Sequence, residues 1–383
     1  MSIMIKVLFV VPDLELGGAE RHVVTLLPRL DPNRFQASVV CIGKEGQLFA
    51  SLRDAGVSAT ALNRRKTQAA GALHDLVHLI RRESPDLVVC RGYNAEVLGR
   101  AASVLAGVKH CIVWVHQIGD VRPRGVLRGV LDSILDRWTT AYFGVAQAQR
   151  PYLTDELGFS AEKIHIIHNG VDVTNFETGD DRGVLAEFGW QNGEQVVGIL
   201  AALRPEKDHA TLLRAARIVI NELPSARFLI IGDGKMRDHL EHLARELDIE
   251  SHVHFTGSRT DVGRLLRAID VFTLSSVTVE CFPMALLEAM ACGRAAVCTA
   301  VGGVAEIIDH GVTGYLVPPT DPTCLADRLI SLLAEPQTCR RMGSAGRDRV
   351  EREFTLDRSV VDAQAAFERV LNGRRPSTEG VFL

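Results

Sequence analysis

The sequence predicts an α/β protein built from two doubly wound domains, each with a parallel sheet. Short apolar runs rich in β-branched residues alternate with helical stretches along almost the whole chain, which is the pattern of repeated βαβ units. The length of 383 residues suits two such domains better than one. A polar, glycine-rich stretch near the middle breaks the alternation, so we expect the domain boundary there.

The first half of the chain predicts one parallel sheet, because right-handed crossovers put the helices between successive strands on both of its faces. We expect this N-terminal domain to cover residues 1–174. Its expected strands are residues 5–11, 37–42, 86–90, 110–115 and 164–167, and its expected helices include 19–30, 71–83 and 95–106.

The second half repeats the pattern after an expected linker at residues 175–194. We expect the C-terminal domain to cover residues 195–354 and a final helix at about 355–373. Its expected strands are residues 195–201, 227–231, 252–255, 270–274 and 295–299, with helices at 210–222, 236–247, 261–268, 284–292 and 325–333.

Composition excludes several classes of protein. Apolar residues make up 46% and charged residues 23% of the chain, which is typical of a globular protein and not of a disordered one. The net charge of −4 gives no reason to expect a nucleic-acid partner. No apolar run is long enough to cross a bilayer. The eight cysteines lack CxxC or Cys/His metal spacing, which favours buried, reduced thiols in a cytoplasmic protein.

The most informative segment runs from Leu274 to Gly293, directly after an expected strand. Pro283 suits the first turn of a helix, and the free N–H groups and dipole at a helix start suit a phosphate. Glu280 precedes this helix and can accept bonds from sugar hydroxyls, while Glu288, within it, can bind ribose hydroxyls. For any isolated pair of glutamates, solvated side chains without a role are the commoner case.

Two cations follow the first strand of the second domain. Arg204 and Lys207 can neutralise a diphosphate as its bond to a sugar breaks, which stabilises the transition state more than the ground state. The alternative is an ordinary surface arginine and lysine at the end of a strand. The first βα loop ends in Gly17 and Gly18, which let a backbone approach a ligand closely but also suit a plain tight turn. No GxGxxG follows the first strand, which argues against a dinucleotide oxidoreductase.

The segment Glu280-x-Phe-Pro-x₄-Glu288-Ala-Met-Ala-Cys-Gly resembles the E-x₇-E signature of the retaining GT-B glycosyltransferases of family GT4. Further segments resemble motifs of this family in the same order along the chain. They are Gly17-Gly18-Ala-Glu20, His168-Asn-Gly-Val-Asp172, Arg204-Pro-Glu-Lys207, Gly232-Asp-Gly234, Phe255-Thr-Gly-Ser-Arg259 and Glu306-Ile-Ile-Asp-His-Gly-Val-Thr-Gly314.

The resemblance implies a GT-B architecture of two Rossmann-like domains that face a cleft, with the final helix crossing back to the first domain. It implies a nucleotide-diphosphate sugar donor, expected to be a UDP-sugar, on the second domain and an acceptor on the first. The implied catalytic residues are Glu280, Arg204, Lys207 and His116. The implied donor-binding residues are Gly17, Gly18, Arg259, Phe282, Pro283, Met284, Ala285 and Glu288.

The implied reaction retains the anomeric configuration, with the leaving phosphate oxygen taking the proton of the acceptor. We expect no cofactor and no metal, because Arg204 and Lys207 can do the work of a cation and no DxD motif lies between the strands. The expected acceptor is a glycan, a lipid-linked or a small molecule, in polysaccharide or glycoconjugate biosynthesis. The alternatives are a nucleotide-sugar epimerase or hydrolase of the same fold, or a sugar-binding relative without catalysis.

Three features stay open from the sequence. His116 matches in position a histidine of the family that touches the donor sugar, but a histidine bonded to a backbone carbonyl explains it equally well. Cys281 stands where the family has glycine, and can alter the choice of donor or point away from it. Residues 126–138 predict a helix with one apolar stripe. Packing of this stripe on the domain's own sheet is the favoured interpretation, and peripheral contact with the inner face of a membrane is the alternative.

Overall fold

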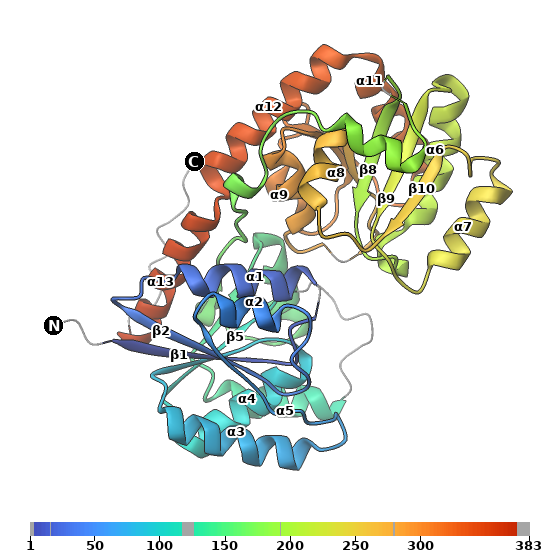
Figure 1. Cartoon of the computed structure of the whole chain (residues 1–383). Coiled ribbons are helices and arrows are strands. Elements are labelled where there is room, and N and C mark those ends of the chain that lie inside the picture. Colours follow the sequence, from blue (N-terminus) through green and yellow to red (C-terminus); the bar gives the residue numbers. More distant parts are fainter. Residues whose placement is uncertain (1–3, 16, 117–125, 192, 279, 374–383) are drawn as a thin grey trace. The chain divides into compact units, whose positions relative to one another are not determined.

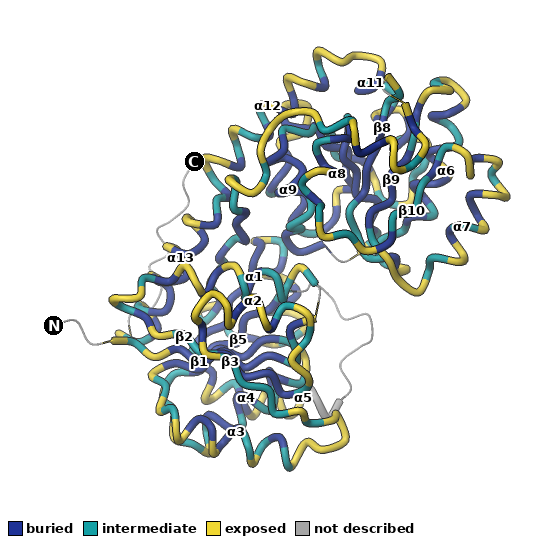
Figure 2. The backbone as a smooth tube through the Cα atoms, in the orientation of Figure 1, coloured by how far each residue is buried: buried dark blue, intermediate teal, exposed yellow. Residues whose placement is uncertain are grey.

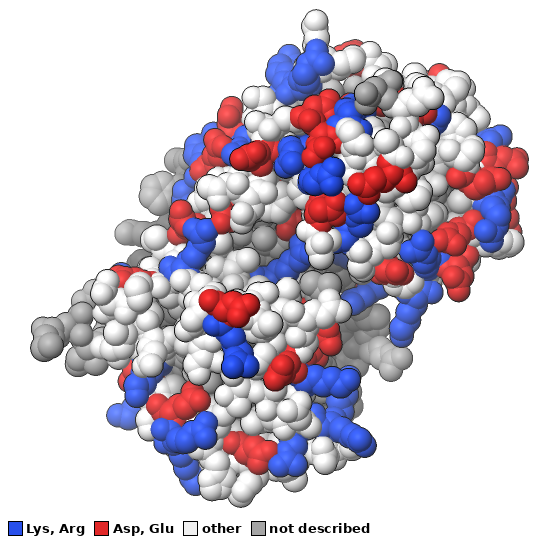
Figure 3. Space-filling view, viewed as in Figure 1, with Lys and Arg blue, Asp and Glu red and all other residues white. Residues whose placement is uncertain are grey.

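The computed structural model describes residues 4–15, 17–116, 126–191, 193–278 and 280–373, and for residues 126–128 only the backbone. The chain divides into two compact units (Figure 1). The N-terminal unit contains the described residues of Met1–Asn169 and Leu356–Leu383, and the C-terminal unit those of Gly170–Thr355. On the face drawn in Figure 3, acidic and basic side chains are interspersed over both units.

The sheet of the N-terminal unit has seven parallel strands in the order β3-β2-β1-β4-β5-β6-β7. The strands are β1 Ile5–Val11, β2 Phe35–Cys41, β3 Ser58–Ala61, β4 Leu87–Cys90, β5 His110–Trp114, β6 Ala141–Gly144 and β7 Ile164–Ile166. The α-helices are α1 Gly18–Leu26, α2 Phe49–Asp54, α3 Ala69–Glu83, α4 Tyr93–Ala106, α5 Val126–Asp136 and α13 Leu356–Leu371.

The sheet of the C-terminal unit has six parallel strands in the order β10-β9-β8-β11-β12-β13. They are β8 Gln195–Leu200, β9 Ala226–Ile231, β10 Val253–Gly257, β11 Val271–Leu274, β12 Ala295–Thr299 and β13 Gly314–Val317. The α-helices are α6 His209–Glu222, α7 Arg237–Glu246, α8 Val262–Ala268, α9 Met284–Ala291, α10 Val304–Ile307, α11 Pro322–Ala334 and α12 Pro336–Glu353. The predicted fold class, two doubly wound parallel sheets, is confirmed.

Both sheets are covered by helices on each face, which explains their apolar strands. Every residue of β4 and of β12 is buried, and the strands form the dark centre of each unit in Figure 2. In the N-terminal unit, α3, α4 and α5 lie on one face of the sheet and α1 and α13 on the other (Figure 1). In the C-terminal unit, α6 packs with α11, and α9 with α12.

Each sheet has a switch point, where successive connections leave in opposite directions. In the N-terminal unit it lies between β1 and β4, and in the C-terminal unit between β8 and β11. Ligands of open α/β sheets bind in the crevice beyond the carboxyl ends of the strands at such points. The fold therefore marks one candidate site in each unit.

The last helix, expected at about 355–373, is α13, and it packs within the N-terminal unit. The ring of Phe367 contacts those of Phe9, Trp114 and Phe143 at centroid distances of 6.0–6.4 Å. The Ser359 hydroxyl donates to the backbone oxygen of His168 at 2.8 Å. The end of the chain thus completes the core around its first strand.

The observed division of the chain differs from the expected one at residues 175–194, which belong to the C-terminal unit. Residues 182–188 form a 3₁₀ helix in which Val184 and Leu185 are buried. Arg182 forms an ion pair with Asp270, at the start of β11, and donates to the backbone oxygen of Glu194 at 2.8 Å. The glycine-rich, polar composition that suggested a linker belongs to a segment held by ion pairs and turns.

The favoured interpretation of the apolar stripe at 126–138 is wrong. Leu135 is buried, but Val130, Leu131, Ile134 and Trp138 are 50%, 36%, 49% and 50% exposed. The inner face of α5 is held instead by Asp132, whose carboxylate pairs with Arg100 of α4. Both side chains of this pair are almost fully buried. The buried side of α5 therefore carries an ion pair where the sequence analysis placed the apolar stripe. The side chains of residues 126–128, with Arg122 and Arg124, lie outside the described part of the chain.

Candidate active site

The switch point of the C-terminal unit brings together three polar side chains from two loops. Lys207, after β8, donates from Nζ to Oε1 of Glu280, after β11, at 2.6 Å. Ser276 Oγ donates to the same oxygen at 2.6 Å. The Glu280 side chain is only 6% exposed and that of Lys207 22% exposed, so the carboxylate is buried with its partners. Two of the residues implied by the family motifs thus lie in direct contact.

Backbone geometry holds the two loops in place. A Cβ on Gly234 would lie 2.4 Å from the backbone oxygen of Leu203, so the turn after β9 can pack against the loop after β8 only with glycine at this position. The two site loops are also bonded to each other. Ser275 Oγ donates to the backbone oxygen of Lys207 at 3.0 Å. The backbone N–H of Val277 donates to the backbone oxygen of Glu206, also at 3.0 Å.

The helix that follows Glu280 begins at the expected residue, Met284, but Pro283 precedes its first turn. Pro283 is the N-cap residue, with extended backbone, and α9 begins at Met284. The N–H groups of Met284 and Ala285 are therefore in the first turn, where a helix leaves its donors without intrahelical partners. Phe282 is buried and packs its ring on Phe354 at 5.3 Å between centroids.

Glu288 and Cys281, which lie in the same segment, are both buried. Glu288 is 5% exposed within α9, and Cys281 is 7% exposed. Burial, together with the charge of Glu280, raises the pKa of the Cys281 thiol well above its ordinary value, so Cys281 is a neutral side chain beside the Lys207–Glu280 pair.

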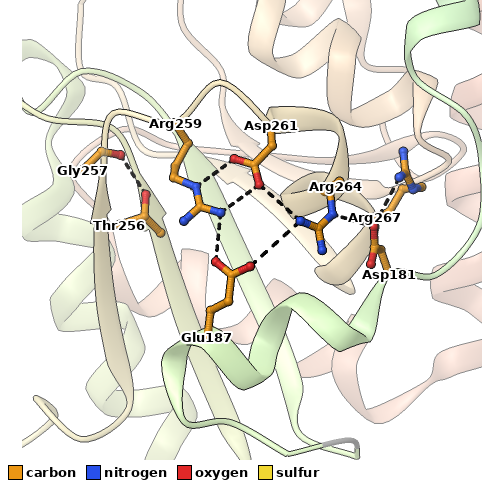
Figure 4. Close-up of polar contacts among 8 residues, drawn as sticks. All are labelled: Asp181, Glu187, Thr256, Gly257, Arg259, Asp261, Arg264 and Arg267. Atoms are coloured by element: carbon orange, nitrogen blue, oxygen red, sulfur yellow. Dashed lines mark hydrogen bonds and ion pairs between the residues drawn. The ribbon is translucent and has the colours of Figure 1, made fainter.

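Arg204 and Arg259 lie apart from this contact. The Arg204 side chain is 66% exposed, and among the described carboxylates only that of Glu206 lies within ion-pair distance, at 4.0 Å. Arg259 is held by Asp261 at 2.8 Å and Glu187 at 3.0 Å, in the network of ion pairs drawn in Figure 4. Its hydrogen bond lowers the pKa of the Asp261 carboxyl. The donor-binding role expected of Arg259 stays a prediction, since its guanidinium already has two carboxylate partners.

The switch point of the N-terminal unit holds a cavity of about 170 Å³ at the carboxyl ends of β1, β4 and β5. Gly17 and Gly18 begin α1, whose first turn contributes part of the cavity wall, and a Cβ on Gly17 would lie 2.2 Å from Oε2 of Glu20. The residues that line the cavity are Val11, Pro12, Asp13, Leu14, Ala19, Glu20, Val23, Arg91, Gly92, Glu96, Trp114 and His116.

His116 lies in this cavity beside a second histidine. Its ring is 5.0 Å from that of His22 and 5.7 Å from that of Trp114. Its Nδ1 is 3.5 Å from the backbone oxygen of Trp114, which is a long contact, and its buried Nε2 has no partner among the described residues. Burial, then the charge of Arg91, holds the pKa of His116 well below its ordinary value, so the ring is neutral at pH 7.

Sequence reasoning missed Arg91, His22 and Ser276. Arg91 directly follows the fully buried strand β4 and is itself 4% exposed. The available signal was a charged residue followed by Gly92, at the end of an apolar run, because side chains after parallel strands gather at one edge of the sheet. His22 and Ser276 carry no comparable signal, since either is ordinary in a helix or a loop.

Neither a metal-binding cluster nor a membrane span occurs in the described part of the chain. Across the described ranges, no group of three or more His, Cys, Asp or Glu residues could hold a metal ion. None of the helices in those ranges has the length and apolar character that a membrane span requires. All eight cysteines are free thiols, and those of Cys90 and Cys111 lie 3.7 Å apart.

The chain is similar to glycosyltransferases over both units. Against N-acetyl-alpha-D-glucosaminyl L-malate synthase of Bacillus anthracis it is 32% identical over 218 residues, which are 57% of each chain. Against UDP-Gal:alpha-D-GlcNAc-diphosphoundecaprenol alpha-1,3-galactosyltransferase of Escherichia coli it is 25% identical over 90% of this chain and 92% of the other. The crystal structure of Anabaena HepE in complex with UDP superposes with a TM-score of 0.82, at 22% identity over 95% of this chain and 100% of that chain.

Two family profiles match the chain side by side. Residues 16–175 match Glycosyltransferase Family 4, and residues 184–349 match Glycosyl transferases group 1. The two matched segments fall on the two sheets and include both switch points. The chain therefore belongs to glycosyltransferase family 4, the group 1 glycosyl transferases, and has their GT-B fold.

Proposed function

We propose that the protein transfers a sugar from a UDP-sugar to an acceptor, with retention of the anomeric configuration. The observation that carries this proposal is the buried contact of Lys207 and Ser276 with Glu280 at the switch point of the C-terminal unit. The C-terminal unit then holds the donor and the N-terminal unit holds the acceptor, as the two switch points suggest.

The diphosphate of the donor is the group that this site suits best. Lys207, Arg204 and the first turn of α9 supply positive charge to the two loops, and a helix start with free N–H groups favours phosphate. As the sugar leaves, its diphosphate gains charge, which preorganised cations stabilise. Because both donors to Glu280 among the described residues go to Oε1, its Oε2 is available for a sugar hydroxyl.

The proposed reaction needs neither a protein nucleophile nor a metal. The departing phosphate oxygen takes the acceptor proton while the acceptor oxygen bonds to the anomeric carbon from the face that the diphosphate leaves. We expect transfer to continue in the presence of a chelator. Complete loss that Mg²⁺ or Mn²⁺ restores would contradict this part of the proposal.

A panel of UDP-, GDP- and ADP-sugars tests the proposal. UDP-sugars should raise the melting temperature of the wild type, because a ligand that binds only the native state stabilises it by mass action. Lys207→Ala should abolish this shift, while Arg341→Ala, an exposed arginine on α12, should keep it. Formation of a new sugar nucleotide without an acceptor would identify an epimerase instead, and release of free sugar alone a hydrolase. A sugar-binding relative would bind the donor and leave it unchanged.

We also propose that α5 rests on a membrane surface, with the protein at the cytoplasmic face. Val130, Ile134 and Trp138 are exposed at helical spacing, and Leu131 lies beside them. Exposed Arg137 adds positive charge, and tryptophan suits the interface of anionic lipids. A lipid-linked acceptor also occurs in the name of the Escherichia coli relative.

Sedimentation with vesicles tests the contact. Wild type should bind phosphatidylglycerol vesicles, and the double variant Ile134→Ser, Trp138→Ser should lose this binding. The control is Val361→Ser, at a 59% exposed apolar residue of α13 in the same unit. Equal binding by the double variant, or none by the wild type, would contradict the proposal.

A further inference from the structure

Arg91 is a buried cation with one nitrogen that has no partner among the described residues. Its side chain follows β4 and lines the cavity of the N-terminal unit, and the residue is 4% exposed. Nη1 lies 3.2 Å from Nδ1 of His22, while Nη2 is buried and has no partner among the described residues. No described carboxylate is within ion-pair distance of this guanidinium. An arginine is rarely buried unless it is paired, because desolvating an unpaired charge is costly.

Two further nitrogen donors surround Arg91. A guanidinium only donates, so His22 accepts at Nδ1, and a neutral His22 must then carry its proton on Nε2. Its ring is 5.1 Å from that of Trp114, whose Nε1 can only donate. Nε2 of His22 and Nε1 of Trp114 are both buried and have no partner in the described part of the chain. Together with Nη2 of Arg91, three buried donors have no acceptor among the described residues, and Arg91 and Trp114 both line the cavity.

The charge of Glu20 offsets only part of the effect of burial, which lowers the pKa of Arg91 to about 9, and no described carboxylate forms an ion pair with Arg91. Glu20 and Glu96 lie in the first turns of α1 and α4, where the helix dipole compensates their charge. Asp13 accepts from the backbone N–H of Glu15 at 3.3 Å. The oxygens of Asp13 and Glu20 are suited to accept bonds from hydroxyl groups. The cavity wall therefore carries both donors and acceptors.

We infer that this cavity binds the acceptor substrate, and that the acceptor is a small hydroxylated molecule with a carboxylate or phosphate that Arg91 receives. The cavity of about 170 Å³ is smaller than an ordinary ligand pocket, which favours a small acceptor or a small head group. The acceptor role rests on the proposed function, whereas the anion site can be tested without any transfer.

Calorimetry on the full chain tests the site, with UDP at saturating concentration so that anions are kept from the diphosphate site. The probes are L-malate, inositol 3-phosphate and inorganic phosphate, with myo-inositol as the neutral match. We expect a hydroxylated anion to bind the wild type and myo-inositol not to bind. Arg91→Met should weaken anion binding by about thirtyfold or more, as loss of one partner of a buried charge pair does. The matched control, Arg341→Met at an exposed arginine, should leave it unchanged.

A measurement on the wild type tests the anion site even if Arg91→Met does not fold. The chain has three tryptophans, so the indole N–H signal of Trp114 can be assigned with Trp138→Phe and Trp190→Phe. An anion bound at Arg91 should shift the Trp114 signal and leave the other two in place. No shift at millimolar malate or phosphate esters, or equal binding of myo-inositol, would overturn the anion site. If UDP still binds and Lys207→Ala still abolishes its binding, the proposed function survives that result.

The probes also show whether the charged group of the acceptor is a carboxylate or a phosphate ester. Binding of malate without inositol 3-phosphate identifies a carboxylate acceptor, and the reverse identifies a phosphate ester. Binding of inorganic phosphate alone would overturn the inference, because the site would then hold an anion but not the hydroxylated acceptor that Asp13 and Glu20 are placed to receive.

Discussion

At the scale of single residues, the contact between Lys207 and Glu280 determines what the C-terminal unit can bind. A buried carboxylate with two donors on one oxygen is held in one orientation, so it can present its second oxygen to a ligand without first losing conformational freedom. The two loops that carry these residues are separated by more than seventy positions in the chain, and the parallel sheet brings them together.

Lys207→Ala should lower kcat by a factor of about 10²–10³, because one preorganised charge contact to the leaving group is lost. It should also lower the free energy of unfolding by about 2–3 kcal/mol, since Glu280 stays buried without its partner. Steady-state rates and urea unfolding measure both effects. In the double variant Lys207→Met, Glu280→Gln, stability should recover while activity does not. Recovery of both would show that the pair is only structural.

Buried neutral histidines make the protein sensitive to acid. Burial, and then the charge of Lys207, lowers the pKa of His209 to about 4, and burial likewise lowers the pKa of His165 to about 4. The unfolded chain takes up a proton near pH 6.5, before the folded chain does, so stability is full above that pH and falls as the pH drops towards 4.

His209→Leu should therefore flatten this acid dependence. Between pH 7 and pH 4 the variant should lose about 3 kcal/mol less stability than the wild type, since one histidine contributes about 1.4 kcal/mol for each pH unit between the two pKa values. Urea unfolding at pH 7, 6, 5 and 4 measures the difference. Parallel curves for the two proteins would show that His209 is not the group that is protonated on unfolding.

At the scale of helices and strands, α13 stabilises a sheet whose first strand lies more than three hundred residues earlier. Phe367→Ala should destabilise the N-terminal unit by about 3–5 kcal/mol, because the ring is fully buried against Phe9, Trp114 and Phe143. Val361→Ala, on the exposed side of the same helix, should change stability by less than about 0.5 kcal/mol. Thermal unfolding of both variants tests this, and similar melting temperatures would show that α13 is dispensable for the core.

The elements that the sequence predicted are those with long, uninterrupted apolar patterns. β3, β6 and β13 were missed. β3 and β13 are edge strands with partly exposed side chains, and β6 ends in a glycine. The eighteen-residue helix α12 was missed for another reason, since its buried side includes Gly343 and Gly346. A Cβ on Gly343 would lie 2.0 Å from the backbone oxygen of Gly293, so this glycine permits close packing where the sequence suggests a break.

The residues of the candidate sites also fall into a group that the sequence predicted and a group that it did not. Motif spacing predicted that Glu280 and Lys207 serve one site, because both follow strands that the alternation had already located. It did not predict the ion pair of Asp132 with Arg100, which turns the apolar stripe of α5 outward. Nor did it single out Arg91, whose importance follows from burial with Nη2 unpartnered among the described residues. Such properties depend on partners distant in sequence, which periodicity does not report.

At the scale of the whole molecule, the two units have the same architecture. Each unit has its own sheet, its own core and its own switch point, and the residues that we assign to the donor and to the acceptor anion fall in different units. Lys207, Glu280 and α9 all belong to the C-terminal unit, whereas Arg91, His22 and Trp114 all belong to the N-terminal unit. Binding of each ligand should therefore stabilise its own unit.

Calorimetric unfolding of the full chain tests this separation. UDP at about a hundredfold excess over its Kd should stabilise the C-terminal unit by about 2.7 kcal/mol, which corresponds to a rise in melting temperature of about 5–10 °C for a unit of this size. Phe367→Ala identifies the transition of the N-terminal unit, because it lowers that one alone. UDP should leave this transition in place, and a hydroxylated anion should raise it. If UDP moved the transition that is sensitive to Phe367→Ala, the nucleotide would bind residues of the N-terminal unit, and the assignment of the donor to Lys207 and Glu280 alone would be wrong.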